Sequence, residues 1–152
     1  LAGPFDDRGV IAIDADHLER CYRDIGKLAD VVVVEGAGGF IVPLDAAGNS
    51  DDFVARLGLP VVLVVGIRLG CINHALLTQQ AILAKPLRLA GWVANRIDPD
   101  EPYAQAMIDS LRQRIHAPLL GQLPWSPVMD ARQAARLLDP LALGLSRAVA
   151  VP

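Results

Sequence analysis

Residues 30–43 read DVVVVEGAGGFIVP, a stretch that indicates a parallel α/β sheet. The four consecutive valines at 31–34 show no polar alternation, which is typical of a strand buried on both faces. Glu35 is therefore expected at the carboxyl end of a strand, where open α/β sheets bind their ligands. A hard carboxylate beside a loop with almost no side chains indicates Mg²⁺ with phosphates. A tight turn whose glutamate caps the next segment explains the same residues. The loop consists of Gly36, Ala37, Gly38 and Gly39.

The composition limits the class of protein. The chain has 152 residues, of which 53% are hydrophobic and 20% charged, and this is the size of one compact domain. Its mean hydropathy of +0.36 is high, but the apolar runs are far too short to span a bilayer. A net charge of -3 without a basic stripe argues against a nucleic-acid partner. Two cysteines without metal-ligand spacing suit reduced thiols in a cytoplasmic protein.

Helical and strand patterns alternate along the chain. Such alternation predicts parallel βαβ units with right-handed crossovers. The predicted strand ends carry Glu35, Gly66 with Arg68, Asn95 with Arg96, and Pro124 with Trp125, and polar or loop-forming residues at three of them suit a nucleotide. Helices are expected at about 14–29, 50–57, 70–84, 102–115 and 130–138, and strands at 31–34, 61–65, 87–94 and 118–123.

Four motifs resemble those of a known family: EGAGGFIVPL at 35–44, LPVVLVVGIRLGCINHALLT at 59–78, LAGWVANRID at 89–98 and APLLGQLPW at 117–125. They look like dethiobiotin synthetase, the biotin-pathway ligase that closes a ureido ring on 7,8-diaminopelargonate with ATP, Mg²⁺ and CO₂. The resemblance covers about residues 13–124, and GCINHALLT and AGWVAN are its most specific motifs. It implies a P-loop NTPase-like, three-layer α/β/α fold with a mostly parallel sheet, and a cytoplasmic homodimer with sites at the interface.

The resemblance implies roles for the glycine loop and for a helix start. Glu35 would ligate Mg²⁺, the loop residues at 36–38 would line the ATP phosphates, and Gly38 would also contact the diamine. The helix start would bind the substrate carboxylate across the dimer interface, through the residues Gly70, Cys71, Ile72 and Asn73. Free backbone N–H groups and the positive end of a helix support that role.

The resemblance also implies a purine pocket. Asn95 would hydrogen-bond the adenine edge through its side-chain amide, and Arg96 would cover the base. The opposite wall would consist of Pro124, Trp125 and Ser126. Asn95 could equally end a strand in a turn, and Trp125 could be ordinary packing.

One expected motif does not occur in these 152 residues, the phosphate-binding loop G-x-x-x-x-G-K-[ST]. Its lysine and hydroxyl, and the residues that handle the carbamate, are therefore not in the chain, and no catalytic residue is assigned within it. We expect a single α/β domain at 1–152. Because residues 1–8 read as a loop and the phosphate-binding motif is missing, we expect this domain to be the carboxyl-terminal part of a synthetase and to be inactive alone. The family's substrate-contacting tyrosine falls at Met107, with Tyr103 one turn earlier, which leaves that contact open.

Two other functions stay open on the sequence. A non-catalytic dimer partner could lend its helix start at 70–73 to an intact subunit, and restored turnover in a mixture with a P-loop-defective protein would reveal it. A ParA/MinD-like or cobyrinate-synthase-like ATPase shares the fold and the acidic strand end. Asn95 permits this reading and the motif at 70–75 argues against it; nucleotide-dependent dimerisation without diaminopelargonate binding would favour it.

Overall fold

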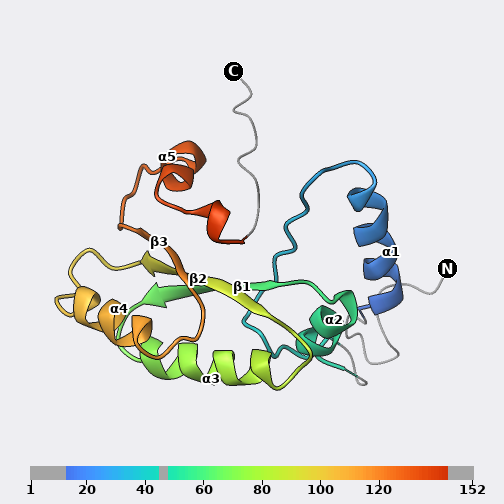
Figure 1. Cartoon of the computed structure of the whole chain (residues 1–152), viewed down its shortest axis with the longest axis horizontal. Coiled ribbons are helices and arrows are strands. Elements are labelled where there is room, and N and C mark those ends of the chain that lie inside the picture. The colour runs from blue at the N-terminus through green and yellow to red at the C-terminus, as the bar shows by residue number, and fades with distance from the viewer. Residues whose placement is uncertain (1–12, 45–47, 144–152) are drawn as a thin grey trace. The chain divides into compact units, whose positions relative to one another are not determined.

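The computed structural model describes residues 13–44 and 48–143, and the chain divides into two compact units, residues 1–59 and 60–152. The loop expected at 1–8 lies outside the described residues. The second unit holds a parallel three-stranded sheet in the order β1-β2-β3 (Figure 1). Its strands are β1 (Val61–Ile67), β2 (Leu89–Arg96) and β3 (Leu119–Leu123), which confirms three of the strands expected from the sequence.

Two helices cover one face of this sheet, α3 (Cys71–Leu83) and α4 (Ala104–Arg112) (Figure 1). Their apolar residues meet the strands in a core whose largest fully buried side chains are Ile67, Ile82, Trp92, Ile108 and Leu111. Trp92 is thus a core residue, as its place inside a strand predicts. The first six residues of β2 are all buried, because the central strand is covered on both faces.

The chain after β3 returns to the edge of that strand. It passes through α5 (Ala131–Arg136) and the 3₁₀ helix η1 (Pro140–Leu143), which contacts β2. Gly121 and Leu138 form an antiparallel bridge, and the Asp139 N–H donates to the Leu120 carbonyl at 2.7 Å. The segment that follows the third strand is therefore fixed against it by backbone hydrogen bonds.

The first unit contains two helices, α1 (Ala15–Gly26) and α2 (Ser50–Leu57). Asp14 caps α1 by accepting a hydrogen bond from the His17 N–H at 3.0 Å, and Gly58 ends α2 with a φ of 65°. Arg56 of α2 pairs with Asp16 at 2.6 Å and with Glu19 at 2.5 Å on α1. These ion pairs tie the two helices together.

The strand expected at 31–34 is wrong, because these residues form no strand in the described part of the chain. Val31, Val33 and Val34 are 57%, 87% and 46% exposed. A run of β-branched residues favours extended backbone, but it becomes a strand only where a neighbouring strand offers hydrogen-bond partners. Glu35 consequently follows an exposed extended segment instead of a sheet strand.

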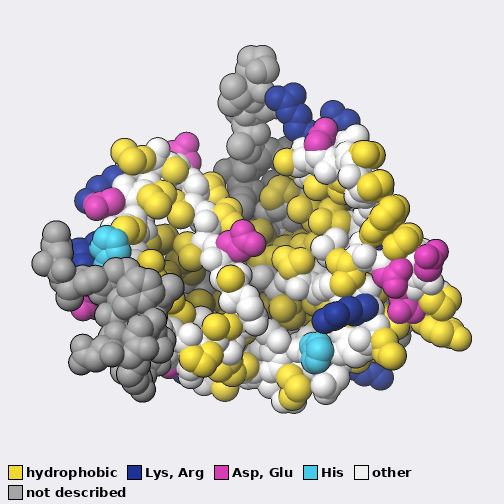
Figure 2. Space-filling model, turned by 180° about the vertical axis from the view of Figure 1, so that it is seen from behind, with side chains coloured by type: hydrophobic (Ala, Val, Ile, Leu, Met, Phe, Trp, Pro, Cys, Tyr) yellow, Lys and Arg dark blue, Asp and Glu magenta, His cyan; other side chains and the backbone are white. Residues whose placement is uncertain are grey.

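Hydrophobic side chains are exposed over parts of the surface (Figure 2). The most exposed of them in the second unit are Leu69, Val128 and Tyr103. No helix among the described residues is both long enough and apolar enough to cross a membrane.

Candidate functional site

The strand register of the second unit places several predicted site residues at one edge of the sheet. Asn95 pairs with Gly66 of β1 on one side and with Leu123 of β3 on the other, and Arg96 pairs with Ile67. Because all three strands are parallel, their carboxyl ends meet there. This edge is where the sequence analysis expected ligand-binding residues.

A pocket of about 380 Å³ lies at this edge and gathers the five residues predicted to form the purine site. They are Asn95, Arg96, Pro124, Trp125 and Ser126. The volume falls within the range of small-molecule sites, roughly 300–1,000 Å³. Residues separated by about 30 positions in the sequence thus line one cavity, as the resemblance implied.

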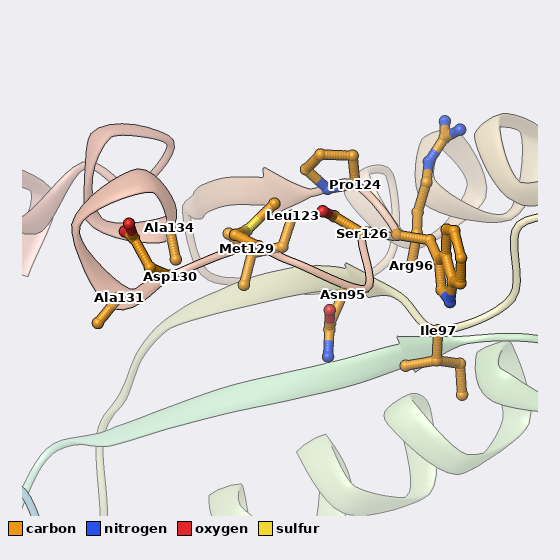
Figure 3. A pocket seen from close by; sticks show the side chains of 11 residues that line it. Asn95, Arg96, Ile97, Leu123, Pro124, Ser126, Met129, Asp130, Ala131 and Ala134 are labelled. Atoms are coloured by element: carbon orange, nitrogen blue, oxygen red, sulfur yellow. The ribbon is translucent and has the colours of Figure 1, made fainter.

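The side chains at the end of β2 alternate in direction. Asn95 and Ile97 project from one side of the strand and Arg96 from the other (Figure 3). Arg96 Nη2 donates to Gln105 Oε1 at 3.0 Å, which holds the guanidinium against α4. Asn95 makes no side-chain hydrogen bond among the described residues, so its amide is available as both donor and acceptor to a ligand.

Six residues that line the pocket were not predicted from the sequence. Ile97 and Leu123 are direct neighbours of predicted residues, whereas the other four come from a later part of the chain, namely Met129, Asp130, Ala131 and Ala134. They lie just before and within α5, which begins at a capping box: the Gln133 N–H donates to Asp130 Oδ1 at 2.8 Å, and the Asp130 N–H to Gln133 Oε1 at 3.0 Å. The pattern D-x-x-Q signals that helix start in the sequence. It does not reveal that the helix lies beside the end of the second strand.

The predicted carboxylate site is the start of α3, which follows β1 at the same sheet edge. Gly70 caps the helix with a φ of 88°, a conformation that favours glycine. The Cys71 N–H donates to the Arg68 carbonyl at 3.0 Å, whereas the N–H groups of Ile72 and Asn73 belong to the first turn and have no intrahelical acceptor. Two free donors at a positive helix end suit a carboxylate.

Cys71 contributes its backbone to this helix start, because its thiol is buried. Its Sγ lies 3.6 Å from the Sδ of Met107 on α4, and the residue is 3% exposed. Met107 is half-buried in this contact, whereas Tyr103 at the start of α4 is 69% exposed. Met107, the residue at the position of the family's tyrosine, therefore packs on the start of α3.

The Glu35 loop belongs to the first unit. Gly38 and Gly39 have φ values of 85° and 117°, so this loop needs glycine at both positions. The Ser50 hydroxyl fastens the loop's far end by accepting from the Val42 N–H at 2.9 Å and donating to the Phe40 carbonyl at 2.6 Å. These two hydrogen bonds attach the segment that follows the loop to the first residue of α2.

The residues around Glu35 fit a magnesium ion that is held mainly by phosphate. No group of three or more His, Cys, Asp or Glu residues with metal-binding geometry occurs among the described residues. Mg²⁺ in nucleotide sites needs only one or two carboxylates, because phosphates and water supply its other ligands. The exposed Glu35 carboxylate meets that requirement as one hard oxygen ligand.

A family model described as AAA domain, a family of P-loop NTPases, matches residues 6–133. The chain belongs to this family. Its α/β fold agrees with that assignment, and the P-loop NTPase-like fold class expected from the sequence is confirmed.

Three curated relatives are named ATP-dependent dethiobiotin synthetase BioD. The protein from Nitrosospira multiformis is 50% identical over 140 residues, which cover 92% of this chain and 62% of the relative. That from Janthinobacterium sp. is 47% identical over 129 residues, covering 85% and 55%. That from Aromatoleum aromaticum is 50% identical over 128 residues, covering 84% and 57%. The chain thus spans a little over half the length of these relatives, and the likeness seen in the four motifs is confirmed.

Proposed function

We propose that this AAA domain chain is part of an ATP-dependent ligase that forms dethiobiotin from 7,8-diaminopelargonate and CO₂. The observation that carries the proposal is that one pocket at the ends of β2 and β3 is lined by all five residues expected to bind the purine. The choice of reaction is supported by relatives that are named for this activity and share 50% sequence identity with the chain over the aligned residues. The two cysteines in the described residues are free, which suits a cytoplasmic enzyme.

In this proposal the pocket binds the adenine of ATP. The unpaired amide of Asn95 recognises the purine edge with one donor and one acceptor. Arg96, held by Gln105, and the indole of Trp125, 46% exposed, offer flat groups against which a base can stack. The Asp130 carboxylate, at the same pocket, adds an acceptor for a sugar hydroxyl.

The reaction joins the two amines of the diamine through one carbon. One amine captures CO₂ as a carbamate, the γ-phosphate of ATP activates a carbamate oxygen, and the second amine closes the ring as phosphate leaves. Glu35 would hold Mg²⁺, which offsets negative charge on the phosphates when it is bound. Gly36 and Gly38, on either side of Ala37, would let the phosphates and the diamine approach the backbone.

The start of α3 binds the carboxylate of the diamine in this proposal, and a homodimer completes the site. Leu69, immediately before the helix, is 87% exposed, and Leu77 on the helix is 56% exposed. Exposed apolar side chains that gather beside a binding site are typical of surfaces that contact another protein. Their exposure supports the dimer without identifying its geometry.

Titration of the 152-residue chain with ATP tests the nucleotide part of the proposal. We expect ATP to bind and to change the emission of Trp125, and we expect Asn95→Ala to weaken binding about tenfold or more through the lost purine contacts. Gln80→Ala, which changes an exposed residue of α3, is the matched control and should bind like the unchanged chain. Equal affinities for the unchanged chain and Asn95→Ala would contradict the assignment of this pocket.

A further inference from the structure

Gln79 is a buried polar residue of α3 that takes no part in the sites described above. It is 6% exposed, and its side-chain amide makes two hydrogen bonds to backbone far along the chain. The His116 N–H donates to Gln79 Oε1 at 2.7 Å, and Gln79 Nε2 donates to the Arg114 carbonyl at 3.2 Å. A single side chain thus satisfies one donor and one acceptor in the connection between α4 and β3.

These hydrogen bonds lie just before the point where β3 begins to pair. The Trp92 N–H of β2 donates to the Pro118 carbonyl at 2.9 Å, two residues beyond His116. The pairing between β2 and β3 then shifts register between Trp92 and Val93. A short strand with an irregular register has few hydrogen bonds of its own to fix its position along its neighbour.

The position of β3 decides where the pocket wall lies. The strand ends at Leu123, and Pro124, Trp125 and Ser126 follow at once. A slip of one residue along a strand moves its end by roughly 3.3 Å. Such a movement would separate the pocket wall from Asn95, which is fixed on the central strand.

We propose that Gln79 is a positioning residue that sets the register of β3 and thereby holds the pocket wall at nucleotide-binding distance from β2. The inference rests on the proposed nucleotide role of that pocket. It also links the two candidate subsites of the second unit, because Gln79 lies on the helix whose start is the candidate carboxylate site. The amide acts through the backbone at Arg114 and His116, not by touching the ligand.

Two substitutions at this position separate its two hydrogen bonds. Gln79→Met keeps the length of the side chain and removes both bonds, and we expect the Kd for ATP to rise about tenfold. Gln79→Glu keeps an acceptor for the His116 N–H, but it loses the donor to the Arg114 carbonyl and buries a carboxylate against it, so its Kd should rise at least as much as that of Gln79→Met. Gln80→Met is the matched control, because Gln80 is the neighbouring glutamine and is exposed; its Kd should not change.

A control variant separates a loss of stability from a loss of positioning by Gln79. Ile108→Val removes one methylene from the core of α4 without touching these hydrogen bonds, and it should lower the Tm while the Kd stays constant. Hydrogen exchange should speed up at the His116 amide in Gln79→Met and stay slow in Gln80→Met. If Gln79→Met does not fold, Gln79→Asn carries the test, because it keeps a neutral amide but is one methylene too short for the two backbone groups; we expect a raised Kd and faster His116 exchange.

The inference is overturned if the folded Gln79 variants bind ATP as tightly as the unchanged chain does. An unchanged chain that does not bind ATP gives a separate result: it refutes the proposed function of the pocket, and the role of Gln79 falls with it. ATP binding that is weakened equally by Gln79→Met and Ile108→Val would also overturn the inference, because it would reflect stability alone.

Discussion

The backbone carbonyl oxygen of Leu137 lies 2.1 Å from the position that a Cβ atom on Gly121 would occupy. No side chain fits there, and so the segment that contains α5 can approach β3 only because residue 121 is glycine. The antiparallel bridge from Gly121 to Leu138 depends on this approach. Since α5 lines the pocket, a glycine in a strand contributes to the shape of the binding site.

Gly121→Ala should push the segment around Leu137 away from β3. We expect a loss of about 1–3 kcal/mol in the free energy of unfolding, the usual cost of overpacking, together with weaker ATP binding. Urea denaturation and an ATP titration measure the two effects. Gly26→Ala is the control, because a Cβ at Gly26 meets nothing within 4 Å; a Gly121→Ala chain as stable as this control would contradict the packing described.

Met107→Ala should loosen the contact between α4 and the start of α3. The substitution removes the sulfur that lies 3.6 Å from Cys71 Sγ. We expect the free energy of unfolding to fall by about 2 kcal/mol, the low end of the range for methionine-to-alanine substitutions, because Met107 is only half-buried. Chemical denaturation measures it, with Leu83→Ala on exposed α3 surface as the comparison. If both variants lose the same small amount, the sulfur contact does not stabilise the helix start.

Ser50→Ala should free the end of the glycine loop. The Val42 N–H and the Phe40 carbonyl both lose a partner, and we expect about 1–3 kcal/mol of lost stability in this unit. Hydrogen exchange at the Val42 amide should become faster. Ser50→Thr retains a hydroxyl and should keep the exchange slow, so fast exchange in both variants would argue against the hydroxyl's role.

The helix cap at Asp14 should make α1 sensitive to acid. The hydrogen bond from the His17 backbone N–H is the main cause that lowers the pKa of the Asp14 carboxyl below its ordinary value of 3.8. A lowered pKa in the folded state means that the stabilisation is present above the ordinary value and is lost as pH falls through the lowered one. NMR of the His17 amide should show a titration below about pH 4. Asp14→Asn keeps a capping oxygen that does not titrate. If the His17 amide still titrates in this variant, a group other than the Asp14 carboxyl causes the effect.

The three strands and α3 could be predicted because apolar runs bounded by proline or glycine specify them locally. Pro60 precedes β1, and Gly70 caps the helix that follows it. The valines at 31–34 carry an equally strong strand signal, yet three of them lie exposed and none of the four pairs with a strand in the described part of the chain. A sequence pattern states the preference of a segment, whereas pairing depends on a second segment that the pattern does not name.

The pocket could be predicted only in part, because some of its residues are brought together by long-range contacts. Asn95 and Pro124 follow strand ends, and parallel strands bring such ends together by geometry. Met129 and Ala134 join them because the chain folds back beside Gly121, a long-range contact that no local signal encodes. The two hydrogen bonds of Gln79 were likewise hidden, since a glutamine in a helix usually faces solvent.

The most direct test of the proposed function is an assay of the gene product that carries this chain, supplied with ATP, Mg²⁺, bicarbonate as the source of CO₂, and 7,8-diaminopelargonate. Mass spectrometry should detect dethiobiotin, formed in equal amount to ADP, and Asn95→Ala should raise the KM for ATP. ATP hydrolysis that neither requires the diamine nor yields dethiobiotin would contradict the proposal and favour a switch ATPase.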